Sequence, residues 1–181
     1  MKLKEMKINK QVVIGVLFFA FITVLPAQAA DEAEVRGTVQ RVFQQLKSRD
    51  YSALYDSLPS SSRARMTRDR FATALKRAQD MYVLDRMDVG QVRLAKDIAV
   101  VDTVLYGRVV APLAAEGKIV VQQYLVREDG KWRVATGDSG TIKRFLANNP
   151  AFRAKFPIRQ PRVFVKQGNN WVEFSPGQKR A

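Results

Sequence analysis

The 181-residue chain contains neither cysteine nor histidine. Without cysteine it forms no disulfide and offers no thiolate nucleophile. Without histidine it lacks the side chain that most often serves as a general base and as a metal ligand. The two absences exclude Ser-His-Asp catalysis and zinc sites, and we expect no metal and no cofactor.

The first 29 residues have the parts of a cleavable export signal. A positive start is followed by the apolar run 12–25 and by the small residues Ala27 and Ala29. The run is shorter than the roughly 20 apolar residues that a membrane-spanning helix needs. We therefore predict cleavage between Ala29 and Ala30 and a mature protein that is periplasmic or secreted. An uncleaved membrane anchor is the alternative.

Basic residues are in excess, with 31 Lys and Arg against 17 Asp and Glu. The excess is concentrated in residues 141–181, which contain nine basic residues and the single acid Glu173. Basic side chains interleaved with aromatic ones favour anionic partners. We predict an anion-binding surface for anionic lipid or polymer, with nucleic acid excluded by export. Its residues are Lys143, Arg144, Arg153, Lys155, Arg159 and Arg162. The alternative is a solvated helix face.

Helical patterns come before any strand pattern. Apolar residues recur at helical spacing from Val35 to Leu46. A short second helix is predicted after Asp50, which can cap it. The run 59–62 is expected to break the chain, and a third helix is predicted over about 67–80.

From residue 82 the apolar period becomes that of β-strands. Strands are predicted over 87–94, 98–110, 118–127 and 131–136, and Asp129-Gly130 is typical of a two-residue hairpin turn. Beyond Asp138, which is expected to start a helix, the pattern predicts two helices, a final hairpin and a flexible tail from residue 175. The predicted class is α+β, with N-terminal helices packed on an antiparallel sheet and C-terminal helices and a β-hairpin added.

The stretch 32–138 resembles the nuclear transport factor 2-like (NTF2-like) superfamily. The resemblance lies in the opening helix, in RDYSALYDSL, in the strand around residues 96–101 and in EDGKWRVATGD. It implies a strongly curved sheet that forms a cone with the helices around an internal cavity. The implied division is a signal peptide 1–29, an NTF2-like domain 30–138 and a basic extension 139–181. The superfamily includes isomerases, dehydratases and non-catalytic binding domains, so the fold does not decide the activity.

One strand carries a carboxylate among apolar residues. Asp102 and Tyr106 share a face of it with Ile98, Val100 and Val104. If this face lined the cone, Asp102 would be a buried base beside the Tyr106 phenol, as an isomerase or lyase requires. The alternative is that Asp102 pairs with a basic residue of a neighbouring strand. The candidate ligand-binding residues are Tyr55, Asp102, Tyr106, Gln122 and Tyr124.

The missing histidine and cysteine favour a non-enzymatic binding or assembly module of the cell envelope, acting through its cavity or its basic surface. Its partner is expected to be an envelope component or a small apolar ligand, and a homodimer is a further candidate. A small-molecule isomerase or lyase using Asp102 and a tyrosine is the alternative function.

Overall fold

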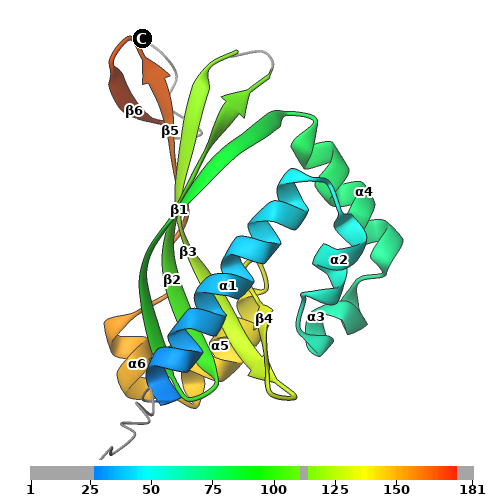
Figure 1. Ribbon diagram of the computed structural model, residues 1–181, viewed down its shortest axis with the longest axis vertical. Helices are drawn as coiled ribbons and strands as arrows, with labels where there is room; N and C mark the ends of the chain where they lie inside the picture. Colours follow the sequence, from blue (N-terminus) through cyan, green and yellow to red (C-terminus); the bar gives the residue numbers. More distant parts are fainter. Residues whose placement is uncertain (1–26, 111–113, 175–181) are drawn as a thin grey trace, which may run out of the picture.

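The computed structural model describes residues 27–110 and 114–174 (Figure 1). The predicted export signal as far as residue 26 and the predicted flexible tail 175–181 lie outside these residues. The helices are α1 (Ala27–Lys47), α2 (Tyr51–Asp56), α3 (Ser60–Arg65), α4 (Arg68–Gln79), α5 (Ser139–Ala147) and α6 (Pro150–Lys155). None of the helices in the described part of the chain is long and apolar enough to cross a bilayer.

The strands form one antiparallel sheet. They are β1 (Tyr82–Ala95), β2 (Ile98–Val109), β3 (Glu116–Glu128), β4 (Lys131–Val134), β5 (Arg162–Gln167) and β6 (Asn170–Phe174). Their order is β1-β2-β3-β5-β6, and β4 pairs with the second half of β3. The predicted α+β class is confirmed, and the C-terminal hairpin joins the main sheet because β5 pairs with β3 at residues 117–120.

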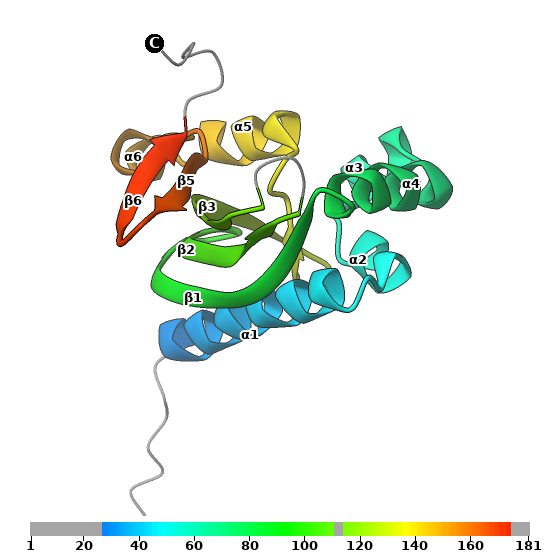
Figure 2. The ribbon, with the colours of Figure 1, turned by 90° about the horizontal axis from the view of Figure 1, so that it is seen from above.

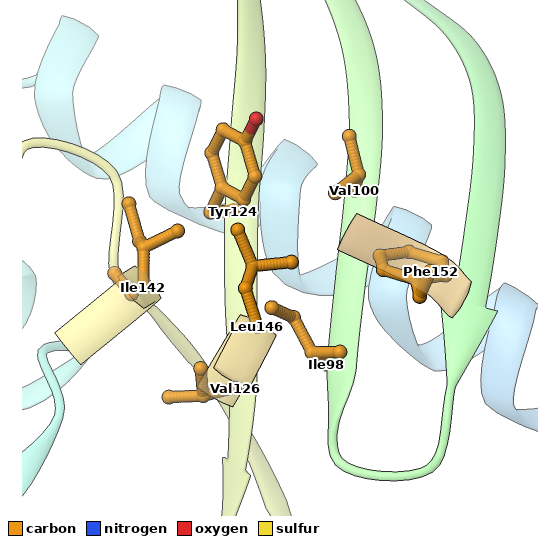
Figure 3. Packing of buried hydrophobic residues seen from close by; sticks show 8 residues of the cluster. Ile98, Val100, Tyr124, Val126, Ile142, Leu146 and Phe152 are labelled. Atoms are coloured by element: carbon orange, nitrogen blue, oxygen red, sulfur yellow. The ribbon is translucent and has the colours of Figure 1, made fainter. Parts of the chain in front are cut away.

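The sheet lies between two helical layers. Figure 2 shows α1 on one side of the strands and α5 and α6 on the other. The α1 side buries Val35 and Val39 against β2, β3 and β4. The opposite side buries residues of β2 and β3 against α5 and α6, as Figure 3 shows: Ile98, Val100, Tyr124, Val126, Ile142, Leu146 and Phe152. The lower half of β2 is therefore apolar on both faces.

Strand β1 is long and bent. Its pairing with β2 shifts between Leu84 and Arg86 and again between Val89 and Val92. Such bulges bend a strand and increase its twist. Near the first bulge β1 and β2 approach so closely that a Cβ on Gly107 would collide with the backbone of Val83. Strand β1 also begins five residues earlier than predicted.

Most turn and cap predictions are confirmed. Asp50 accepts a hydrogen bond from Ala53 N at 3.0 Å and caps α2. Asp129 and Gly130 have φ values of 49° and 72°, as a two-residue hairpin turn requires. The predicted break at 59–62 is wrong, because helix α3 begins at Ser60. The carboxylate of Glu128 on β3 accepts from Ser60 N at 2.8 Å and so satisfies the helix start.

Candidate functional site

An apolar pocket of about 250 Å³ lies between α1, α2, α4 and the sheet. We call it the helix pocket. Its lining is Val39, Val42, Phe43, Leu46, Leu54, Ser57, Leu58, Phe71, Leu75, Met87, Leu105, Gln123, Val134 and Thr136. The polar members are neutral hydroxyl and amide side chains. Among the residues that the structure describes, no ionisable side chain lines the helix pocket.

Buried Gln79 positions α4 as the outer wall of this pocket. Its Nε2 donates to the Leu46 carbonyl at the end of α1 at 2.7 Å, and its Oε1 accepts from the Tyr51 hydroxyl on α2 at 2.6 Å. One amide thus joins three helices, and both of its polar ends are satisfied. Its removal would leave buried partners without hydrogen bonds, which is costly.

The pocket continues to a polar mouth lined by Ser62, Arg65 and Asp138. Asp138 caps α5, as predicted, by accepting from Thr141 N at 3.0 Å. Its other oxygen accepts from Thr141 Oγ1 at 2.8 Å, from Ser62 Oγ and from Arg65. Burial raises the pKa of Asp138, but these hydrogen bonds and the Arg65 charge outweigh it and hold the pKa below its usual range. Asp138 is therefore an ionised structural anchor rather than a proton acceptor.

Asp102 lies on the other side of the sheet. The face of β2 that carries it is the one covered by α5 and α6, whereas Leu105 of the same strand faces the helix pocket. The Asp102 carboxylate forms an ion pair of 2.7 Å with Arg93 of β1, and its side chain is 41% exposed. This is the pairing that the second interpretation of the sequence expected. Asp102 is therefore not the buried base that the isomerase or lyase alternative requires.

Gln122 and Tyr124 extend the Asp102 pair into a chain of hydrogen bonds. Gln122 Nε2 donates to Asp102 Oδ1 at 3.2 Å. The Tyr124 hydroxyl lies 3.2 Å from Gln122 Oε1 and 3.0 Å from the Pro157 carbonyl. These contacts join β2 and β3 to the segment after α6, and they give each polar group a partner within the protein.

The other two candidate ligand-binding residues lie apart. The Tyr106 ring stacks under the Arg86 guanidinium at 3.6 Å, near the β6 residue Trp171. Tyr55 packs on Phe71 of α4 and donates to the Met66 carbonyl at 2.8 Å. None of the candidate residues lines the helix pocket, so the structure does not assemble them into one site.

The basic set is exposed on α5, α6 and the segment that follows. Among the described residues, Lys143, Arg144, Arg153, Lys155 and Arg159 form no ion pair, so their charges face solvent. Arg162 differs, because it makes two hydrogen bonds to Glu173, at 2.9 and 2.7 Å. Within residues 27–110 and 114–174, no three acidic side chains gather in a group able to hold a metal ion.

Sequence reasoning did not assign Leu105 and Gln123 of the sheet to a pocket. It also missed Gln79, the last residue of α4, which joins α4 to α1 and α2. Strand β2 has apolar residues on both of its faces, so the pattern of apolar residues could not indicate which face meets α1. Gln79 could have been found from the sequence as a polar residue on the inner, otherwise apolar face of an amphipathic helix.

Comparison with protein-family models and with curated proteins finds no match to this chain. Among solved structures, the chain is similar to a protein from Campylobacter jejuni described as an NTF2-like transpeptidase. The two share 15% identity with a TM-score of 0.38, over 59% of this chain and 95% of the other.

Proposed function

We propose that this protein is an exported, non-enzymatic binding module of the NTF2-like type that holds a small apolar ligand in the helix pocket. The observation that carries the proposal is the lining of that pocket, which is apolar with a few neutral polar groups. Pockets of this kind favour apolar ligands and use the polar groups to orient them. The volume of about 250 Å³ favours a small ligand or one segment of a longer one.

The lining also favours binding over catalysis. General acid–base chemistry needs an ionisable side chain within hydrogen-bond reach of the reacting atoms. The pocket wall has none, and Asp138 at its mouth is held by Ser62, Thr141 and Arg65. Asp102, the base of the isomerase alternative, lies on the opposite face of the sheet in an ion pair.

A neutral, solvent-sensitive dye tests the proposal. N-phenylnaphthylamine should bind residues 30–181 at one saturable site with increased fluorescence, because its rings would leave water for the pocket. Leu75→Trp replaces a leucine side chain in the pocket wall with a larger indole ring. It should weaken dye binding about tenfold, since overfilling a pocket excludes its ligand. Ala74→Trp, on the exposed side of α4, is the matched control and should bind as the wild type does.

Equal affinity of the two tryptophan variants would place the dye elsewhere and remove the pocket from the function. Absence of saturable dye binding in the wild type would also remove the pocket from the function. Circular dichroism of both variants checks that the fold is retained.

A further inference from the structure

Strand β6 is an exposed edge of the sheet. It pairs with β5 on one side, and among the described residues no strand lies on its other side. All its residues are exposed, with Trp171 at 36%, Val172 at 41% and Phe174 at 44%. Proteins usually protect such an edge with lysine, proline or a covering element. Strand β6 contains neither lysine nor proline.

The hairpin turn decides which backbone groups point outward. Gly168 and Asn169 form a two-residue turn, so Gln167 and Asn170 make a hydrogen-bonded pair. Hydrogen-bonded and non-hydrogen-bonded pairs alternate along an antiparallel ladder. Trp171 and Glu173 therefore direct their N–H and C=O groups away from β5. These are the groups that an added strand would bind.

One side of this edge is apolar. A second pocket, of about 260 Å³, lies on the α1 side of the sheet beyond the helices; we call it the sheet-end pocket. Its apolar lining includes Leu84, Leu105, Ile119, Val163, Val165 and Phe174, and the basic residues Arg108 and Lys118 also border it. Phe174 belongs to β6, so an added strand would place every second side chain beside this pocket.

The other side of the edge is cationic and aromatic. The Lys118 ammonium lies 4.7 Å from the centre of the Trp171 ring and 5.1 Å from that of Phe164. Among the described residues Lys118 has no acidic partner within ion-pair distance. Glu173 is already bound by Arg162, and Lys166 by Glu116. The uncompensated charge beneath Trp171 is therefore positive.

We propose that β6 receives an extended segment of another protein as an added strand, with apolar and acidic residues alternating along that segment. The apolar residues would lie against the sheet-end pocket. The acidic residues would lie on the face of the sheet that carries Lys118, from which β5 and β6 separate the added strand. The main-chain groups of Trp171 and Glu173 would bind the segment, as in other cases of strand addition. A second copy of this chain fits less well, because residues 30–181 contain 27 basic and 16 acidic residues and so repel another copy.

A labelled peptide with the sequence Thr-Val-Glu-Val-Glu-Val-Thr is the probe, measured by fluorescence anisotropy with residues 30–181. It should bind, and the same peptide with lysine in place of glutamate should bind about tenfold more weakly at low salt. Alternate residues of a strand direct their N–H groups to opposite edges. N-methylation of the set that faces β6 should therefore abolish binding, and N-methylation of the set that faces away should not. Equal binding of both methylated peptides would overturn strand addition.

Variants at Glu173 test the edge in the protein itself. Glu173→Pro removes an outward N–H and no main-chain bond to β5, although it also removes the carboxylate that Arg162 of β5 binds. Peptide binding should fall about tenfold or more. Glu173→Thr keeps the N–H and loses the same carboxylate, so it is the matched control and should bind. Leu75→Trp, which blocks the helix pocket, should leave peptide binding unchanged. Failure of the dye experiment and failure of this one are thus distinguishable.

Two other occupants would overturn the proposal. A concentration-dependent dimer in sedimentation that is lost in Glu173→Pro would identify a second copy on the edge. Peptide binding that appears only after removal of residues 175–181 would identify the chain's own tail as the occupant.

Discussion

Arg93 on β1 and Asp102 on β2 form an ion pair of 2.7 Å on the face of the sheet that is turned away from the helix pocket. The contact brings Nη1 of Arg93 directly against Oδ2 of Asp102, so the two opposite charges compensate each other. The guanidinium also stacks on Phe156 at 4.9 Å. This pair links two strands to the end of α6.

From this arrangement we predict that Asp102→Asn leaves dye binding in the helix pocket unchanged, since the whole sheet separates the two. A double-mutant cycle with Arg93→Gln should give a coupling free energy of about 1 kcal/mol or less, because Asp102 is partly solvated. Urea unfolding of the four proteins measures it. A strong loss of dye binding in Asp102→Asn would revive the isomerase or lyase alternative.

Asp138 should make stability depend on pH. Its pKa is lowered in the folded protein, so its contribution is full above the unfolded value, near 3.9, and is lost as pH falls through the folded value. Asp138→Asn keeps a capping oxygen and loses the charge opposite Arg65. We expect it to lower the unfolding free energy at pH 7 by about 1 kcal/mol.

The same substitution should cost little at a pH below both values, where the wild-type carboxyl is also neutral. Urea unfolding at neutral and acid pH gives the comparison, with Asp129→Asn at an exposed turn as the control. A cost for Asp138→Asn that stays constant across this range would mean that charge has no part in it.

The basic surface of α5 and α6 should bind anionic membranes. Each Lys or Arg near such a surface contributes about 1 kcal/mol, so four together give measurable binding. We expect the mature protein to co-sediment at low salt with vesicles rich in phosphatidylglycerol and not with phosphatidylcholine alone. Glutamine at Lys143, Arg144, Arg153 and Lys155 should abolish this, and added salt should weaken it.

The matched control removes the same number of positive charges from another part of the surface. Glutamine at the exposed residues Arg41, Arg70, Lys76 and Arg77 should leave vesicle binding nearly intact, because these residues lie on α1 and α4. If both sets reduce binding equally, only the net charge matters and the surface has no special role. Equal binding to both vesicle types would remove the lipid partner.

Export should produce a chain that begins at Ala30. In the structure Asp31 forms an ion pair with Arg127 of β3, and the Arg127 guanidinium stacks on Trp132 at 4.5 Å. The start of α1 that remains after cleavage is therefore attached to the sheet. Mass spectrometry of protein recovered from the envelope or medium checks the prediction, and intact precursor in the membrane fraction would instead establish an uncleaved anchor.

Local signals predicted most of the elements in this protein. Asp50, Asp129-Gly130 and Asp138 act through hydrogen bonds or backbone angles within a few residues, so the sequence alone determined the α2 cap, the β3–β4 turn and the start of α5. The helical periods of α1 and α5 were similarly readable, because one face of each helix is buried.

Only the tertiary structure decided where the pocket lies. Strand β2 is covered by α1 on one face and by α5 and α6 on the other, so both of its faces are apolar and a period of two cannot distinguish them. The first N–H of helix α3, at Ser60, is bound by Glu128, which lies 68 positions away along the chain. Contacts between distant residues place Asp102 outside the pocket and β6 at the edge, and no local pattern records them.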